Sequence, residues 1–355
     1  MRHGSPALLV VFLLLVALPG PALASEGRLE AKVVGKLPTA NYRAASVATG
    51  DAVFIFGGRN ETDLTPAVVR YDVVTGKATV VGWGLPEPRM SACAVYDGRH
   101  AYVFGGANGG KELDTILQIE LASGDIRMLD VKLPSPRIGL SAIMYGGMTY
   151  IFGGHSNGTM ISAILRFDPL LGDLSTMGAT LPAGLAGIGI ALDERGILLF
   201  GGNTGSGGTD RVMRYDPEKD DLTVLPERLP YPVFHASAAG VNGKVLLIGG
   251  SGQLVGWEVS RATDTIIEFD PSTGRSQILM AGMPSPRERA VSASINGRVL
   301  VFGGQQGVRA LDDIVAISPV KNDGDGLDGP VLRAALPVMM LCVVVTSVLT
   351  GTRRR

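Results

Sequence analysis

The hexapeptide TYIFGG occupies residues 149–154 and is one of six short apolar runs that each end in a glycine pair. The six pairs begin at Gly57, Gly105, Gly153, Gly201, Gly249 and Gly303. Successive pairs are 48 residues apart four times and 54 residues apart once. A repeat of about 50 residues is typical of the four-stranded blade of a propeller. The sequence therefore predicts an all-β, six-bladed β-propeller.

Each repeat has the same order of parts around its glycine pair. In the third repeat, a proline-rich turn at 133–136 precedes a strand of small residues, and a tight turn leads to the strand that ends at Gly153. A polar loop and a third strand, AILRFD at 163–168, follow. Turns of the type Asp-Pro-x-x-Gly, as at 270–274, lead to a fourth strand, because proline and glycine favour chain reversals.

The repeats resemble the kelch family over about residues 28–318. The resemblance rests on the glycine pairs and on the aromatic–Asp turns Tyr71-Asp72, Phe167-Asp168, Tyr215-Asp216 and Phe269-Asp270. The tryptophan usual in a kelch fourth strand is expected to be missing from every repeat, with Trp83 and Trp257 lying elsewhere. The resemblance implies a six-bladed kelch-type propeller that acts as a protein- or glycan-binding module.

The sixth repeat lacks a fourth strand of its own, because Pro319 and a glycine-rich stretch follow its third strand. The segment RLEAKVVGKLP at 28–38 matches the ends of other fourth strands, such as IRMLDVKLP at 126–134. We therefore expect about Leu29–Val34 to complete the last blade, which would close the propeller over residues 25–320 and remove its open edges.

The two ends of the chain carry different signals. Residues 1–24 have a basic start, an apolar run and a small-residue cleavage site, which is typical of a secretory signal peptide. Residues 331–351 are apolar apart from Arg333 and precede the basic tail 352–355, which predicts a transmembrane helix with a cytoplasmic C-terminus.

On this interpretation, residues 321–330 form a flexible Gly/Asp-rich linker, and the propeller lies outside the cytoplasm, at the cell surface or in the periplasm, as part of a single-pass membrane protein. A processed sorting tail, cut near Gly329 and Pro330, is the alternative for the C-terminal segment.

Charge and cysteine content exclude several classes of protein. Residues 25–330 contain 33 acidic and 27 basic residues, a net charge of about −6, which argues against a nucleic-acid partner. Cys93 is the only cysteine of this region, so no disulfide can form within it. Its stability must therefore come from packing.

Aligned repeats place arginines at the start of several blades, near one mouth of the central channel. These are Arg43, Arg89, Arg137, Arg287 and Arg289. The kelch resemblance implies that Arg89, Arg137 and Arg287 bind acidic ligands, and it extends more loosely to Arg43 and Arg289, which lie two positions further on in the repeat. Guanidinium groups suit carboxylates. The alternative is that each arginine ties neighbouring blades together through backbone carbonyls.

The loops that follow the glycine pairs are rich in amide side chains, which suit sugars and peptide backbones. The predicted ligand-binding residues of these loops are Asn108, His155, Asn203, Gln305 and, in the longer fifth loop, Trp257. Ordinary solvated loops are the alternative, and for Trp257 the alternative is packing on its own blade. Asn60 and Asn157 begin glycosylation acceptor patterns.

Signs of an enzyme are sparse, and the sequence predicts no cofactor and no metal site. The alternative function rests on resemblance to exported kelch-type epimerases or mutarotases that act on sialic acid, for which His235 and Glu288 are the acid/base candidates near the mouth. The favoured interpretation is a membrane-anchored binding module for a protein or carbohydrate ligand that carries a carboxylate.

Overall fold

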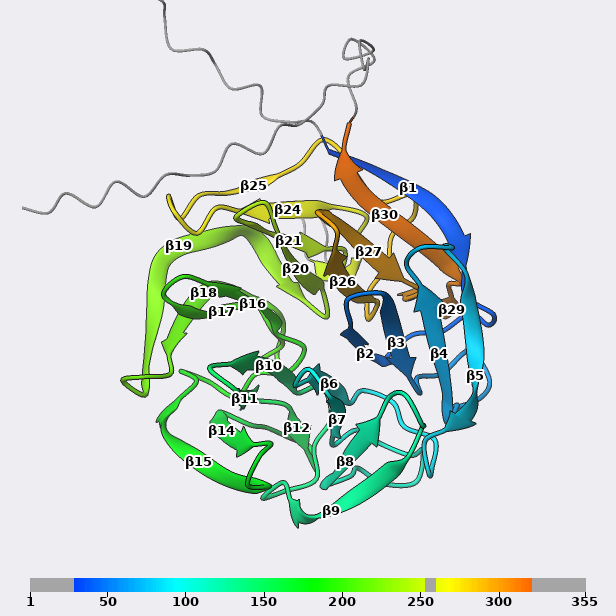
Figure 1. The fold of residues 1–355 in the computed structure, drawn as a ribbon. Coiled ribbons are helices and arrows are strands. Elements are labelled where there is room, and N and C mark those ends of the chain that lie inside the picture. The colour runs from blue at the N-terminus through cyan, green and yellow to red at the C-terminus, as the bar shows by residue number, and fades with distance from the viewer. Residues whose placement is uncertain (1–28, 253–259, 321–355) are drawn as a thin grey trace, which may run out of the picture. The chain divides into compact units, whose positions relative to one another are not determined.

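The computed structural model describes residues 29–252 and 260–320, and Figure 1 shows them as a ring of six blades around a central axis. Each blade is an antiparallel sheet whose first strand lies at the axis and whose fourth strand lies at the rim. The predicted all-β, six-bladed propeller is therefore confirmed. No helix of these two ranges is long and apolar enough to cross a membrane.

Blades one to three each contain four consecutive strands of the main sheet. Blade one consists of β2 (Ala45–Ala48), β3 (Ala52–Phe56), β4 (Ala67–Asp72) and β5 (Ala78–Gly84). Blade two consists of β6 (Cys93–Tyr96), β7 (His100–Phe104), β8 (Thr115–Glu120) and β9 (Ile126–Lys132). Blade three consists of β10 (Ser141–Tyr145), β11 (Met148–Phe152), β14 (Ala163–Asp168) and β15 (Asp173–Thr180), with the small hairpin β12 (His155–Ser156) and β13 (Thr159–Met160).

Blades four and five share hydrogen bonds through a long outer strand. Blade four consists of β16 (Gly189–Asp193), β17 (Gly196–Phe200), β18 (Thr209–Asp216) and β19 (Asp221–Phe234). Blade five consists of β20 (Ser237–Val241), β21 (Lys244–Ile248), β24 (Ile266–Phe269) and β25 (Ser276–Ile278), with the hairpin β22 (Ser251–Gly252) and β23 (Arg261–Ala262). The end of β19 pairs with β22, which fastens the two blades together.

Blade six is completed by the N-terminal strand, as predicted. It consists of β26 (Val291–Ile295), β27 (Arg298–Phe302), β30 (Asp313–Pro319) and β1 (Leu29–Lys36), with the hairpin β28 (Gln305–Gln306) and β29 (Arg309–Ala310). β1 pairs antiparallel with β30 from the Leu29–Pro319 pair to the Lys36–Asp313 pair. The closing strand is thus two residues longer than the predicted Leu29–Val34.

The hydrophobic core is divided into six clusters, each lying between two neighbouring blades. An aromatic ring just before a glycine pair repeatedly meets an aromatic ring of an aromatic–Asp turn in the next blade. Phe302 meets Tyr71 with 5.3 Å between ring centroids, and Phe200 meets Phe269 at 5.1 Å. The two sequence motifs that define the repeat are therefore the two halves of one contact between blades.

The glycine pairs lie where one blade passes closest to the next. Gly57 has a φ of 60°, and a Cβ at this position would overlap the carbonyl oxygen of Arg89 in blade two. The following Gly58 donates its N–H to the same carbonyl over 2.8 Å. A side chain would therefore cost both backbone strain and this hydrogen bond.

Other sequence expectations are corrected by the structure or fall outside it. Trp83 lies in β5, the fourth strand of blade one, so the expectation that no fourth strand contains a tryptophan was wrong. The predicted signal peptide, linker, transmembrane helix and basic tail lie outside the described residues, as does Trp257.

Removing the closing strand tests the architecture. Deletion of residues 26–36 should lower the melting temperature sharply, because it exposes the edge of β30 and the core cluster that Leu29 and Ala31 cover. Differential scanning calorimetry measures the effect. Lys32→Ala, on an exposed side chain of the same strand, is the control and should leave the melting temperature unchanged. An unchanged melting temperature after the deletion would contradict this closure.

Candidate functional site

Six backbone hydrogen bonds run head to tail around the propeller axis. Each blade contributes one residue, whose N–H donates to the carbonyl oxygen of the equivalent residue in the preceding blade over 2.7–3.0 Å. The six residues, here called the axial ring, are Arg43, Ser91, Gly139, Gly187, His235 and Arg289. All six have positive φ angles, between 55° and 63°. The bonds close a complete circle, so the axial ring fixes the distance between all six blades at one end of the channel.

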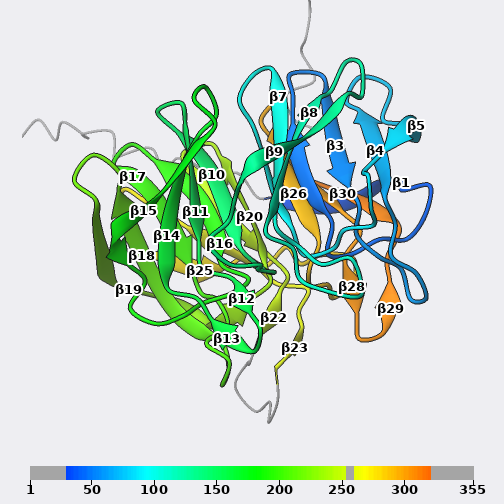
Figure 2. The same ribbon diagram turned by 90° about the horizontal axis from the view of Figure 1, so that it is seen from below.

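The axial ring surrounds a central pocket of about 160 Å³. Its lining consists of the ring and of the residue that follows each ring member in the chain. Each ring member lies a few residues before the first strand of its blade, on the side of the molecule where the loops that follow the glycine pairs lie. Figure 2 shows the hairpins of these loops, β12–β13, β22–β23 and β28–β29, together on this face. This pocket is the mouth that the sequence predicted.

Arg43 is the charged residue at the mouth whose guanidinium group forms the fewest polar contacts. Its Nε is buried without a hydrogen-bond partner, and across the two described ranges its guanidinium group makes no hydrogen bond or ion pair. The guanidinium carbon of Arg43 lies 6.0 Å from the centroid of the Tyr42 ring. Burial lowers the pKa of Arg43 and the nearby charge of Arg289 lowers it further, while Tyr42 and Glu288 oppose them.

Glu288 organises the neighbouring part of the mouth. Its carboxylate accepts hydrogen bonds from Arg289 and Ser251, and from the Gln305 amide over 3.1 Å. Burial alone would raise the pKa of Glu288, but His235, Arg289 and Ser251 outweigh burial and lower the pKa to about 2. Glu288 is therefore ionised at every physiological pH and neutralises Arg289.

His235 lies between these charges. Its Nδ1 is 3.9 Å from Glu288 Oε2, too far for a hydrogen bond, and is buried without a partner. Burial lowers the pKa of His235, and the positive charges of Arg289 and Arg43 lower it further, while Glu288 opposes them. The neutral imidazole is thus the favoured form at neutral pH.

Three of the predicted binding arginines lie inside the protein. Arg89, Arg137 and Arg287 are at most 2% exposed. Each donates from its guanidinium group to the carbonyl oxygen of the first glycine of its own repeat, over 2.8, 3.3 and 3.0 Å respectively. Their backbone carbonyls meanwhile accept from the second glycine of the preceding blade. The guanidinium groups thus bond within their own blade, the backbone carbonyls join neighbouring blades, and none of the three arginines lines the central pocket.

The predicted loop residues divide into two groups. Gln305 joins the mouth through Glu288, and its Oε1 is buried without a partner. The side chains of the other three contact protein groups outside the pocket. The Asn108 amide donates to Glu87 over 2.6 Å, His155 Nδ1 lies 3.2 Å from Glu112, and the Asn203 side chain accepts the Gly205 N–H over 2.8 Å. The structure does not bring these three into the central pocket.

Sequence reasoning missed one member of the mouth cluster and one of its properties. Ser251, directly after the fifth glycine pair, holds Glu288 in place. The positive φ of the axial ring was also missed, although glycine at two of six aligned positions, Gly139 and Gly187, was a signal for it.

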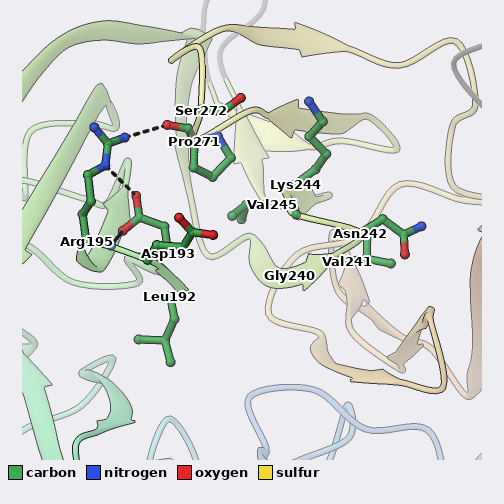
Figure 3. A pocket seen from close by; sticks show the side chains of 12 residues that line it. Leu192, Asp193, Arg195, Gly240, Val241, Asn242, Lys244, Val245, Pro271 and Ser272 are labelled. Carbon is green, nitrogen blue, oxygen red and sulfur yellow. Dashed lines mark hydrogen bonds and ion pairs between the residues drawn. The ribbon is translucent and has the colours of Figure 1, made fainter. Parts of the chain in front are cut away.

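A larger cavity of about 710 Å³ lies on the opposite face, between the turns of blades four and five (Figure 3). Three of its charged side chains, Asp193, Arg195 and Lys244, already have partners. Arg195 donates to the carbonyl oxygen of Pro271 over 2.7 Å, and Asp193 pairs with Arg214 at 2.6 Å. The size of this cavity therefore does not make it the better candidate for a charged ligand.

The mouth is suited to binding an anion. It presents an unneutralised guanidinium group, a neutral imidazole and an ionised carboxylate that is already bound. In the described part of the chain, no group of three or more His, Cys, Asp or Glu side chains is placed to hold a metal ion.

Comparison with known proteins agrees with this architecture. The family described as "KLHDC2/KLHL20/DRC7 Kelch-repeats domain" matches residues 41–250. A solved structure titled "Structure of YjhT" is similar with a TM-score of 0.69 and 20% sequence identity, and the alignment covers 82% of this chain and 98% of that one. At this identity the likeness supports the fold alone. No curated protein matches the sequence.

The buried arginines should support stability. Arg89→Met removes the hydrogen bonds to Gly105 and Thr115 and leaves a buried carbonyl unsatisfied. The free energy of unfolding should fall by about 1–3 kcal/mol. Arg43→Met loses no hydrogen bond and removes an atom that is buried without a partner, so it should not lower the free energy of unfolding. Chemical denaturation checks both values, and equal losses from the two variants would refute this division of roles.

His235 should make the protein sensitive to acid. Because the fold lowers the pKa of His235 below its ordinary value of 6.5, the fold favours the neutral form. That contribution is fully present above pH 6.5 and is lost as the pH falls through the lower, folded-state pKa. His235→Gln should therefore lose less unfolding free energy than the wild type between pH 7 and pH 5. Denaturation curves at both pH values test this, and equal losses of unfolding free energy in the variant and the wild type would contradict it.

Proposed function

The chain belongs to the KLHDC2/KLHL20/DRC7 kelch-repeats domain family, and from this premise we propose that its propeller is a recognition module whose mouth binds a carboxylate on a protein or carbohydrate ligand. Kelch domains generally mediate protein binding, which supports the broader part of the proposal. The observation that carries the finer part is the Arg43 guanidinium group, which has no anionic partner among the described residues.

Arg43 is partly buried, its Nε has no hydrogen-bond partner, and its guanidinium group would favour an anion. Leaving such a group unsatisfied costs more than a typical hydrogen bond contributes, and a carboxylate can satisfy a guanidinium fork with two parallel hydrogen bonds. Arg289 lies next to Arg43 in the axial ring, and its charge adds to the attraction even though Glu288 neutralises much of it. The amide-rich loops around the mouth offer further donors and acceptors to the rest of a ligand.

We further propose that this module works outside the cytoplasm, held at the membrane by residues 331–351. Support comes from the sequence, which has an export signal pattern at 1–24 and an apolar stretch followed by the basic tail 352–355. On this proposal the ligand is met at the cell surface or in the periplasm.

The alternative function, a sugar epimerase or mutarotase, needs proton transfer at the mouth. His235 and Glu288 lie together there, which keeps the alternative open to test. With a pKa of about 2, however, Glu288 is a poor proton donor or acceptor near neutral pH, and only His235 has suitable chemistry. Anomer exchange of sialic acid, followed by NMR, discriminates the two functions. Catalysed exchange that is lost in His235→Gln would favour the enzyme over the binding module.

Arg43→Gln should weaken the binding of carboxylate ligands by about 10–100-fold, because it removes a charged hydrogen bond of about 1.5–3 kcal/mol. Suitable probes are sialic acid and a peptide with one free carboxylate, with dissociation constants measured by calorimetry. Arg309→Gln, on the exposed strand β29, is the matched control and should bind like the wild type. Wild-type affinity in Arg43→Gln, or a comparable loss in a folded Arg137→Gln variant, would overturn the assignment.

A further inference from the structure

The central pocket has two unlike halves. Arg43, His235 and Arg289 come from adjacent blades and fill one side of the axial ring. The other side consists of Ser91, Gly139 and Gly187, which have small side chains or none. A ligand bound to Arg43 therefore has open space across the ring, over the two glycines.

The floor beneath the two halves differs in the same way. Leu140 and Ile188 follow the two glycines and line the pocket, each about 5% exposed. The residues at the equivalent positions of the other four blades are Ala44, Ala92, Ala236 and Ala290. The bulkiest apolar residues of the lining thus belong to the half that has no charges, and their side chains also pack in the core clusters between blades.

The backbone groups of Gly139 and Gly187 already form hydrogen bonds within the axial ring. Gly139 donates to Ser91 and accepts from Gly187, while Gly187 accepts in turn from His235. A ligand hydroxyl placed over Leu140 and Ile188 would find both backbone N–H groups occupied, and only the second lone pairs of the two carbonyl oxygens would remain for it. An aliphatic group suits this surface better.

The charge of the pocket lining and the volume of the pocket further restrict the kind of ligand that fits. Glu288 neutralises Arg289, and burial favours the neutral form of His235, so Arg43 is the charged residue of the pocket lining that has no ion pair. A ligand with a single negative charge would neutralise Arg43. A volume of about 160 Å³ holds roughly five groups of the size of a water molecule, at about 30 Å³ each.

We propose that the mouth recognises a short aliphatic monocarboxylate, either free or as the end of a larger molecule. The carboxylate lies at Arg43 and the hydrocarbon chain lies across Gly139 and Gly187, above Leu140 and Ile188. This inference rests on the proposed function, because it assumes that the mouth binds a carboxylate, and it specifies what the carboxylate is attached to.

The test is a series of acids titrated into the full-length protein in amphipol. Acetate, butanoate and hexanoate have one charge and increasing chain length, and gluconate has one charge and a hydroxylated chain. Affinity should rise by about fourfold for each added methylene until the cavity is full, because each buried methylene adds roughly 0.8 kcal/mol. Gluconate should bind no more tightly than acetate.

Two variants test where the hydrocarbon chain of the ligand lies. Leu140→Ala enlarges the floor, so the acid that binds most tightly should become longer. Leu181→Ala removes a similar buried side chain of the neighbouring core, outside the pocket lining, and should leave the order of affinities unchanged.

The outcomes separate the two claims. If no acid binds, the carboxylate-binding function itself fails. If the acids bind through Arg43 but gluconate equals or exceeds hexanoate, or if affinity does not depend on chain length, then only the aliphatic inference is overturned. Affinity that increases with chain length from acetate until the cavity is full, with a longer tightest-binding acid in Leu140→Ala alone, supports it.

Discussion

The closed circle of six backbone hydrogen bonds at the axis is the constraint on which the rest of this molecule depends. Each bond joins two blades, so the six blades cannot move apart at this end without breaking at least one bond. The circle closes only if every member adopts a left-handed backbone conformation, which the structure gives to all six. The glycine pairs, one step outward, serve the same purpose by letting neighbouring backbones approach.

The left-handed conformation also links architecture to function. In the described ranges, each positive-φ residue that is not Gly, Asn or Asp belongs to the axial ring. These residues are Arg43, Ser91, His235 and Arg289. Such residues cost about 1–2 kcal/mol each in this conformation, a cost that glycine would avoid. Strain that persists where glycine would fit is typical of functional positions, and here three of the four strained side chains line the charged half of the mouth.

The sequence was sufficient for the fold and only partly sufficient for the site. The period of the glycine pairs and the match of residues 28–38 to other fourth strands predicted the six blades and their closure, because both depend on local patterns that every repeat shares. The sequence reasoning favoured Arg89 over Arg43, which lies two positions further on in the aligned repeat. Their difference arises from the backbone, which turns Arg43 toward the pocket lining and buries Arg89 against Gly105. The fourth-strand position of Trp83 was missed because an isolated aromatic residue gives no strand register of its own.

The central claim is that Arg43, and not the buried arginines, meets the ligand. The most direct measurement is an NMR spectrum of the arginine Nε–H groups during titration with a carboxylate ligand. The account predicts that the Arg43 signal shifts in proportion to saturation, with a smaller shift at Arg289, while the signals of Arg89, Arg137 and Arg287 stay in place. Saturable shifts at those three buried arginines with an unchanged Arg43 signal would contradict it.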